Sequence, residues 1–241
     1  MVRMGTKAER TRSAILDATL SLITEEGYEK ATMRAIARKA ELSPGAAYYY
    51  FETKEHIIQA FYEKTFEKFY PEARRIVAES ESLAEGIKGL LEAQFRTSKD
   101  YHGVSKLLFR AALDPDGNLS PFSEQSAPLR NRSVAVYKEL LDRHAPKAVT
   151  RTRGSLPLIL WFYHMGMVAF WVYDKSPDQE RTYRFIERTN GFVARFIHFS
   201  TLKIAAPLIN SGLAVLEEFP LIRAAMEESK EEEQEAETAG V

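Results

Sequence analysis

The sequence predicts an all-α protein, with a small helix-turn-helix module at the N-terminus and a larger helical domain after it. Apolar residues recur every three or four positions in several segments, which is the spacing of one face of a helix. Between residues 32 and 54 the chain has capping residues for two short helices. The 241 residues include no cysteine, which excludes disulfides and thiolate metal sites and fits a reducing compartment.

The two short helices are predicted from residues that favour helix starts. Thr32 is an N-cap for the first helix and Ser43 for the second, with Pro44 at the first helical position, where a missing N–H costs nothing. Gly45 and Ala46 then form a nearly bare leading turn. A recognition helix enters the major groove by such N-terminal residues, and small side chains allow its backbone to approach the base edges. This pattern predicts DNA binding at residues 32–51.

Three consecutive tyrosines separate this prediction from a helical hairpin that binds nothing. Consecutive positions on a helix point about 100° apart. Tyr48, Tyr49 and Tyr50 therefore cannot all enter one small core, and some must face outward. Outward phenols beside basic residues favour a nucleic-acid surface.

The segment resembles the TetR family of bacterial transcriptional regulators. The matching residues are Gly27, Tyr28, Thr32, Ile36, Ala37, Ala40, Ser43, Gly45, Tyr48, Tyr50, Phe51, Lys54 and Glu55. One position departs, because Glu41 stands in the turn where many members have glycine. The likeness is specific over roughly the first quarter of the chain, and beyond it the family shares an all-helical architecture.

The resemblance implies contacts between DNA phosphates and Thr32, Tyr48 and Lys54. The side chains expected near base edges and the adjacent backbone are Arg34, Ala46, Ala47 and Tyr49. The candidate DNA-binding residues are Thr32, Arg34, Ser43, Gly45, Ala46, Ala47, Tyr48, Tyr49 and Lys54.

Charge is distributed unevenly along a chain whose net charge is −1. The first 40 residues have eight Lys or Arg against five acids, whereas residues 217–241 have nine acids against two bases. DNA attracts the basic end and repels the acidic one. The acidic tail, residues 227–241, is expected to be frayed or disordered.

Residues 1–8 are expected to form a flexible arm before a helix from Glu9 to Glu26, which Gly27 ends. The basic residues Arg3, Lys7, Arg10 and Arg12 suit either phosphate and minor-groove contacts or an ordinary solvated terminus. The polar start has no apolar segment typical of a signal peptide, so we expect a cytoplasmic protein.

Four more helices are predicted between residues 54 and 144. The first begins at Lys54, and Pro71 should bend or interrupt it, because proline lacks a donor and clashes with the carbonyl four residues earlier. Residues 82–113 form two helices, and a turn-rich loop follows to about Ser126. A further helix covers residues 129–144.

Residues 154–173 contain no Asp, Glu, Lys or Arg, and this length could span a bilayer. A membrane-tethered or purely structural helical protein is therefore an alternative. Pro157, a central His164 and the placement of the two tryptophans favour the soluble interpretation. In that interpretation the helix is buried by its own domain on one side and by a second copy on the other.

A long helix over residues 178–202 is the predicted partner, with Phe185, Phe192, Phe196 and Phe199 along one side. Packed against their symmetry copies, the two helices would make a four-helix homodimer interface. The arginines at 181, 184, 188 and 195 suit a solvated, ion-paired face or a second nucleic-acid site.

No enzyme signature is present. The chain lacks the phosphate-loop, dinucleotide-binding, zinc-protease and nucleophile-elbow motifs. Its five histidines are scattered, and no two lie four residues apart. We therefore predict no catalytic residues, no metal site and no cofactor, since nothing pairs an acid with a base at a defined spacing.

The C-terminal domain is rich in bulky side chains, which suits either an apolar cavity or a completely filled core. A cavity lined by aromatic residues and Met would take a hydrophobic or aromatic small molecule, with His144 or His164 as a polar anchor. The candidate ligand-binding residues are Phe95, Phe109, Tyr137, His144, Trp161, His164, Met165 and Trp171.

The predicted organisation is a DNA-binding domain over residues 1–53, a ligand-binding and dimerisation domain over 54–226, and the acidic tail over 227–241. The predicted function is a ligand-responsive regulator. It would act as a repressor that a small effector molecule releases from a pseudo-palindromic, double-stranded operator. Such release requires a ligand that binds one separation of the two recognition helices better than the other.

Overall fold

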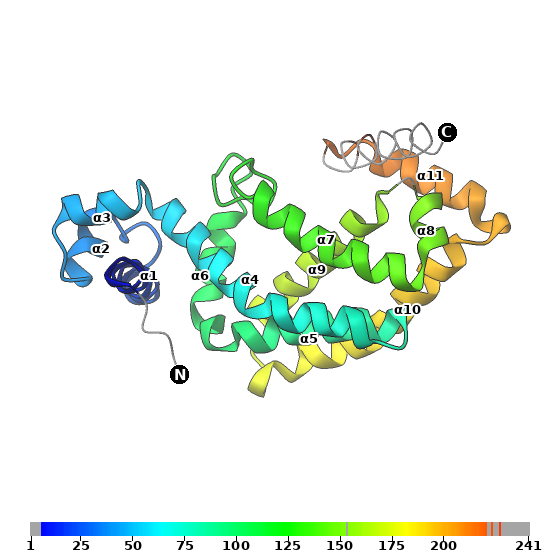
Figure 1. The fold of residues 1–241 in the computed structure, drawn as a ribbon, viewed down its shortest axis with the longest axis horizontal. Helices are drawn as coiled ribbons and strands as arrows, with labels where there is room; N and C mark the ends of the chain where they lie inside the picture. The colour runs from blue at the N-terminus through cyan, green and yellow to red at the C-terminus, as the bar shows by residue number, and fades with distance from the viewer. Residues whose placement is uncertain (1–5, 153, 221–222, 224–226, 228–241) are drawn as a thin grey trace. The chain divides into compact units, whose positions relative to one another are not determined.

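All regular structure in the described part of the chain is helical, which confirms the all-α fold class. The computed structural model describes residues 6–152, 154–220, 223 and 227. The predicted arm before Thr6, with Arg3, and the acidic tail after Glu227 lie outside these residues. The first helices along the chain are α1 (Lys7–Glu26), α2 (Met33–Lys39), α3 (Pro44–Tyr50) and α4 (Lys54–Glu79) (Figure 1).

The helices form two compact units that do not follow the order of the chain. The first unit consists of residues 1–69 and 97–129, and the second of residues 70–96 and 130–241. Helix α4 contributes residues to both units. The division of the chain into domains at residue 53 stays a prediction.

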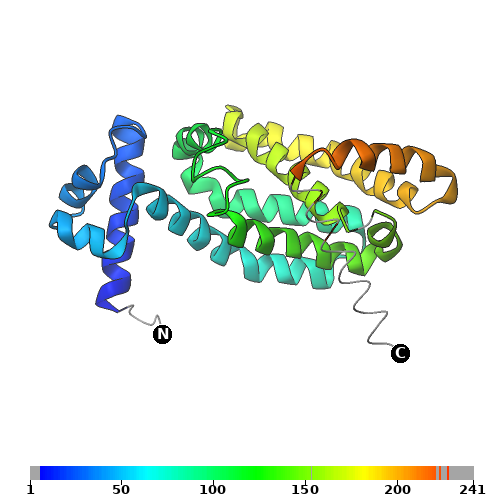
Figure 2. The ribbon, with the colours of Figure 1, turned by 90° about the horizontal axis from the view of Figure 1, so that it is seen from above.

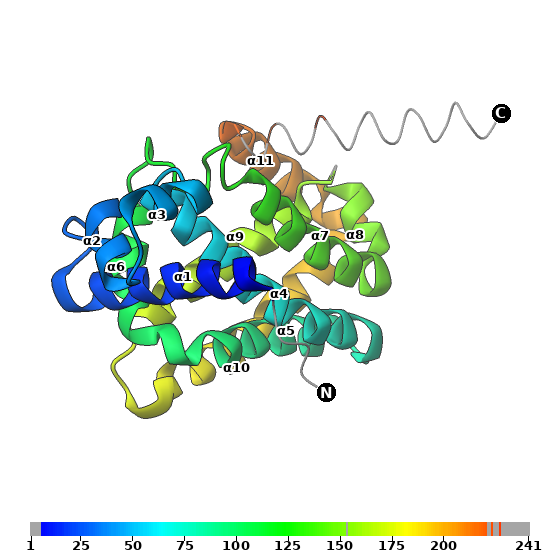
Figure 3. The same ribbon diagram turned by 60° about the vertical axis from the view of Figure 1, so that its left-hand side comes forward.

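The first unit is built on α1, which packs against α2 (Figure 2), and α2 in turn packs against α3. A later segment joins them. Helix α6 (His102–Ala112) packs against α1 (Figure 3), although more than 70 residues separate the two in the sequence. The module that carries the predicted recognition helix therefore includes a helix from the middle of the chain.

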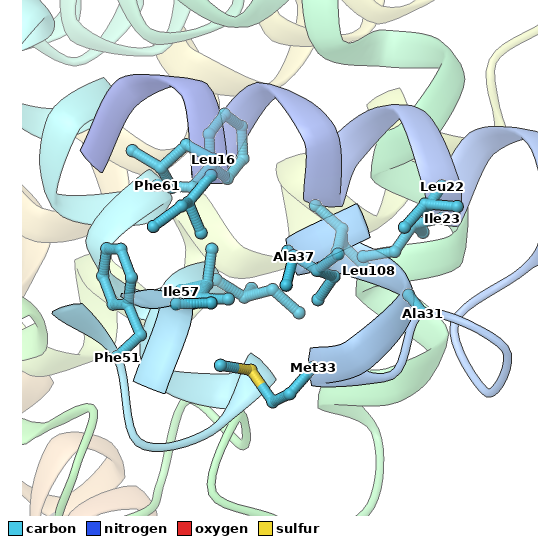
Figure 4. Close-up of a cluster of buried hydrophobic side chains, with 14 of the residues drawn as sticks. Leu16, Leu22, Ile23, Ala31, Met33, Ala37, Phe51, Ile57, Phe61 and Leu108 are labelled. Atoms are coloured by element: carbon cyan, nitrogen blue, oxygen red, sulfur yellow. The ribbon is translucent and has the colours of Figure 1, made fainter. Parts of the chain in front are cut away.

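A single hydrophobic core joins these helices (Figure 4). Ile15 and Ile23 of α1 and Ile36 of α2 are completely buried in it. Leu108 of α6 reaches the same core, as does Leu119 from the loop that follows α6. Burial of a side chain of this size stabilises a fold by about 1.5–3 kcal/mol. The loop after α6 is thus fixed to the first unit by its own apolar residue.

Helix α1 begins two residues earlier than predicted, at Lys7. The reason is a capping box formed by Thr6 and Glu9. The hydroxyl of Thr6 accepts a hydrogen bond from the backbone N–H of Glu9, and the carboxylate of Glu9 accepts one from the N–H of Thr6. Lys7 and Ala8 are therefore helical, and the expectation of a flexible arm through residue 8 is wrong for them.

Helix α4 runs through Pro71 without a break, so the expected interruption does not occur. Pro71 lies on the exposed side of the helix. Water can hydrate the backbone there, which lowers the cost of the missing donor. Buried residues on both sides of the proline, Phe69 and Ala73, keep the helix packed.

Most of the remaining helices belong to the second unit. Their bounds are α5 (Leu83–Ser98), α7 (Ala127–His144), α8 (Pro146–Arg151), α9 (Leu156–Tyr173), α10 (Glu180–Ser200) and α11 (Ala206–Leu216). Single 3-10 turns of this unit lie at Pro177–Gln179 and Lys203–Ala205, and another, at Lys99–Tyr101, lies in the first unit. Helix α5 approaches α7 closely at Gly86, where an added Cβ would lie 2.3 Å from a methyl group of Leu140. A larger residue at position 86 would therefore force the Leu140 side chain to move.

Helix α9 is the charge-free segment, and it is long and apolar enough to cross a membrane. Of this 18-residue helix, 44% is buried by the rest of the chain. The core helix of a soluble protein can have the same length and composition. Helix α10 follows, and a bend of 96° separates it from the segment that contains α11.

Candidate functional site

The N-terminal caps predicted from the sequence are present in the structure. The hydroxyl of Thr32 accepts a hydrogen bond from the N–H of Ala35 over 3.3 Å, at the start of α2. At the start of α3, the Ser43 hydroxyl accepts one from the N–H of Ala46 over 3.2 Å, and Pro44 takes the first helical position. Each cap satisfies a backbone donor that the helix itself leaves without a partner.

Helix α3 has one buried residue and an exposed aromatic face. Ala47 is completely buried in the core of the first unit, whereas Tyr49 is 84% exposed and Tyr48 is 50% exposed. Gly45 faces open space, since an added Cβ would meet nothing within 4 Å. Large exposed aromatic side chains on a well-packed helix indicate a binding surface.

The predicted DNA-binding residues do not all lie on this surface. Thr32, Arg34, Ser43 and Gly45 are exposed, and Ala46 is half-buried. Ala47 is the exception. Its methyl group packs in the core beneath α3, so we correct its predicted role near base edges to a packing role. Spacing along one short helix did not show which small residue faces inward.

The turn between α2 and α3 contains a left-handed residue. Glu41 has φ +56°, a conformation that glycine adopts readily and that a side chain makes unfavourable. This is the position where the sequence departs from the family pattern. The glutamate therefore occupies a conformation that suits glycine, in the turn that sets the angle between the two helices.

Lys54 is half-buried and engaged within the first unit. Its Nζ lies 3.7 Å from the centroid of the Tyr28 ring and donates a hydrogen bond to the Tyr28 carbonyl over 3.1 Å. The phenol of Tyr28 donates to the carboxylate of Glu55 over 2.6 Å. An ammonium has three donors, so this arrangement leaves Lys54 able to bind a further acceptor.

Burial and the Tyr28–Glu55 hydrogen bond together shift the pKa of both residues. Burial, and then the hydrogen bond with Glu55, raise the pKa of Tyr28 far above its ordinary value. Burial acts to raise the pKa of Glu55 as well, but hydrogen bonds led by that from Tyr28 outweigh it and lower the pKa. The pair joins the loop after α1 to the start of α4. The sequence offered no signal for it beyond the family match at these positions.

Among the predicted ligand-binding residues, two pairs are in contact in the second unit. The Phe95 and Trp171 rings stack with centroids 5.4 Å apart, and both side chains are buried. The hydroxyl of Tyr137 is 2.8 Å from Nδ1 of His164. Desolvation lowers the pKa of His164 to about 4, so the ring is neutral at neutral pH.

The other four candidates are placed differently. Trp161 is buried and makes an edge contact with Phe162, and Met165 is half-buried. His144 lies 3.1 Å from the hydroxyl of Ser80, and burial lowers its pKa. Phe109 belongs to the first unit, apart from the other seven.

A cavity of about 410 Å³ lies in the first unit, and none of the eight predicted ligand-binding residues lines it. Its lining is polar and acidic. The residues are Tyr28, Glu29, Glu55, Arg110, Ala111, Asp114, Asp116, Gly117, Asn118 and Leu119. This cavity differs in place and chemistry from the apolar one predicted in the second unit, which stays a prediction. The described residues contain no group of three or more potential metal ligands.

Two family models match the chain. Residues 15–61 match the bacterial regulatory proteins of the tetR family, and residues 87–210 match the tetracyclin repressor-like C-terminal domain. The chain belongs to the TetR family. This is a family of transcriptional regulators rather than enzymes.

Characterised TetR relatives match the DNA-binding end of the chain. The regulator UidR of Escherichia coli K12 is 42% identical over 60 residues, which cover 25% of this chain and 31% of UidR. The repressor KstR of Mycolicibacterium smegmatis is 39% identical over 66 residues, or 27% of this chain and 32% of KstR. The chain thus matches about a third of the length of these relatives.

Solved TetR structures share the fold over most of the chain. FadR from Bacillus halodurans, a regulator of fatty acid degradation, has a TM-score of 0.60 at 19% identity, with 78% of this chain and 96% of that one covered. FadR from Thermus thermophilus, solved with lauroyl-CoA, has a TM-score of 0.56 at 18% identity, with 74% and 92% covered. At these identities the likeness shows the fold alone.

Proposed function

We propose that this TetR-family protein is a dimeric, cytoplasmic repressor that binds a pseudo-palindromic DNA operator and releases it when a small hydrophobic or aromatic molecule binds. The observation that supports DNA binding most directly is the surface of α3. Its helix is capped and anchored by buried Ala47, and two phenols, Tyr48 and Tyr49, extend into solvent. This arrangement suits insertion of a helix into a major groove.

Within this proposal, phosphates are held by Thr32, Tyr48 and Lys54. Arg34, Ala46 and Tyr49 lie near base edges and adjacent backbone, while Ser43 and Gly45 shape the helix start for close approach. Lys54 keeps its Tyr28 hydrogen bond and offers a remaining N–H to DNA.

Selection of duplexes from a random pool tests the DNA proposal. A symmetric dimer should select two inverted half-sites about one helical turn apart. Its affinity should fall steeply with salt as counterions are released from the phosphates. Recovery of only asymmetric duplexes, or only single strands, would exclude this function.

The dimer is proposed to form through α9 and α10. One face of α10 is buried within the chain through Ile186, Ala194 and Ile197, whereas the opposite face exposes an aromatic row. The exposed aromatic residues of the two helices are Phe170, Tyr173, Phe185, Phe192, Phe196 and Phe199. Phe170 and Phe185 stack at 4.7 Å between centroids, which makes the face continuous across both helices. An apolar row of this length favours a protein partner, here a second copy.

Light scattering tests the dimer. Asp in place of Phe192, which is 64% exposed in the single chain, should leave the fold intact but give monomers, because a charge in an apolar interface lacks a partner. Asp in place of Arg184, an exposed residue of the same helix, is the matched control and should leave a dimer. A dimer of unchanged stability in the Phe192 variant would place the interface elsewhere.

The effector site is proposed to lie in the second unit, around the Phe95–Trp171 stack and the Tyr137–His164 hydrogen bond. Buried aromatic side chains with one polar pair suit an apolar ligand that has a single hydrogen-bonding group. The acyl-CoA bound by the FadR of Thermus thermophilus makes a fatty acyl chain one class to test.

A thermal-shift screen with long-chain acyl-CoA, free fatty acids and planar aromatic compounds tests this proposal, with operator release as the second readout. A compound that raises the melting temperature should also release DNA. A polar anion that does both, where no apolar compound does, would contradict the proposed ligand chemistry.

A further inference from the structure

Arg12 links α1 to the C-terminal end of α3. Its guanidinium carbon lies 4.3 Å from the centroid of the Phe51 ring, and its Nη1 donates a hydrogen bond to the backbone carbonyl of Tyr50 over 3.4 Å. Tyr50 is the last residue of α3 and Phe51 is its C-cap. Both contacts of Arg12 therefore lie where the proposed recognition helix ends.

The end of α3 needs such a partner. The last carbonyls of a helix have no partner within the helix and carry partial negative charge, which a cation stabilises. Helix α3 has only seven residues and no basic residue in its last turn. Ser43 caps its first turn from within the segment, whereas the cation at its last turn comes from α1.

Stacking makes the contact directional. A guanidinium is planar, and over an aromatic face it combines cation–π attraction with a fixed set of donors. Phe51 is itself almost completely buried in the core of the first unit, so it forms a rigid base for the guanidinium. The Arg12 side chain is thus held between a fixed ring and the carbonyl that ends α3.

We propose that Arg12 is a positioning residue, which orients α3 so that Tyr48 and Tyr49 meet DNA correctly, and that it does not act mainly through a phosphate. The proposal rests on the proposed DNA-binding function. Arg12 is exposed, so a direct phosphate contact is the competing role. The two roles differ in a measurable way, because loss of a phosphate contact lowers the salt dependence of binding and loss of a positioning contact does not.

The test compares Arg12→Gln and Arg12→Lys with the matched control Arg10→Gln. Arg10 lies on the same helix and is exposed. Affinity for a duplex selected with the wild-type protein is measured by fluorescence anisotropy over a series of salt concentrations. Hydrogen exchange of the Phe51 amide is measured without DNA, since this N–H donates to the Ala47 carbonyl over 3.0 Å and reports directly on the end of α3.

Arg12→Gln should weaken binding by roughly tenfold at every salt concentration, with an unchanged slope of log affinity against log salt. The Phe51 amide should exchange faster in this variant. Arg12→Lys keeps the charge without the planar group and should recover part of both effects. Arg10→Gln should leave the exchange of Phe51 unchanged.

A slope that falls by about two in Arg12→Gln, one for each subunit of the proposed dimer, with normal Phe51 exchange, would assign Arg12 to phosphate and overturn the proposal. Unchanged affinity would overturn it as well. Failure of the wild-type protein to select any duplex would instead remove the DNA-binding function, and an unchanged Phe51 exchange rate would separately refute the Arg12 contact.

Discussion

One carboxylate oxygen of Asp174 accepts two hydrogen bonds from Thr182, from the backbone N–H and from the side-chain hydroxyl, each 2.8 Å long. The other oxygen accepts from the N–H and hydroxyl of Ser176, over 2.9 and 2.7 Å. Asp174 is buried and follows directly after α9. It therefore fixes the connection between the two helices of the proposed dimer interface.

We expect Asp174→Asn to destabilise the protein by roughly 1–3 kcal/mol at pH 7. An amide has only one acceptor oxygen, so two of the four donors lose their partner. Chemical denaturation measures the change. Asp142→Asn, which removes an exposed ion pair with Lys138, is the control and should cost less than about 1 kcal/mol.

The same residue should confer a pH dependence. Burial acts to raise the pKa of Asp174, but the hydrogen bonds from Ser176 and Thr182 outweigh it and lower the pKa to about 2. A lowered pKa stabilises the folded state above the unfolded value, near 4, and this stabilisation is lost as pH falls towards 2. The difference in the free energy of unfolding between wild type and Asp174→Asn should therefore become smaller below pH 4. A constant gap would mean that the carboxylate charge is unimportant.

His164 should make stability fall as pH drops from about 6.5 to about 4. Desolvation lowers its pKa to about 4, so over this range the unfolded chain binds a proton that the folded chain does not. The loss should reach about 3 kcal/mol, and His164→Leu should remove it from the stability profile. A profile that is identical in His164→Leu and wild type would contradict the expected shift.

Tyr49→Ala should weaken operator binding at least tenfold, because it removes a proposed DNA contact. The free energy of unfolding should change by less than about 0.5 kcal/mol, because the side chain is 84% exposed. Tyr50→Ala is the informative contrast. The Tyr50 ring is half-buried and packs against the core of the first unit, so its removal should destabilise the fold as well. Fluorescence anisotropy measures the loss of DNA affinity, and chemical denaturation measures the loss of stability. Unaltered affinity in Tyr49→Ala would show that Tyr49 is not part of the DNA interface.

Position 41 should tolerate glycine better than any β-branched residue. Glu41→Gly removes a side chain from a left-handed conformation, which favours folding, but it adds freedom to the unfolded chain, which opposes folding. We therefore expect the free energy of unfolding to rise by between zero and about 1 kcal/mol. Glu41→Val should destabilise by roughly 1–2 kcal/mol. Thermal unfolding of both variants checks the order, and a Val variant as stable as wild type would show that φ +56° is not imposed by the fold.

Local hydrogen bonds explain which parts of the fold were predictable. The hydroxyls of Thr32 and Ser43 bond to N–H groups three residues later, so the starts of α2 and α3 follow from the sequence alone. Gly27 ends α1 with φ +92°, as its position predicted. The capping box at Thr6 is equally local, because both of its hydrogen bonds join Thr6 to Glu9.

Other features depend on segments far apart in the sequence. Ala46 and Ala47 are chemically identical neighbours, and only packing against the core decided that Ala47 faces inward. Leu119 lies in the first unit because the loop after α6 folds onto the core of that unit. Phe109 belongs to the same unit because its helix, α6, packs against α1. No pattern within the segment 102–126 indicates its partner.

The sequence by itself determined the helical class, the caps of the helix-turn-helix and the family, because each depends on residues within a few positions of one another. Only the tertiary structure decided that Arg12 reaches the end of α3, that Lys54 lies over Tyr28, and that α10 leaves an aromatic row exposed. Helical periodicity shows which face of a helix is apolar. It does not show which segment packs on that face, because the two surfaces meet only when distant parts of the chain fold together.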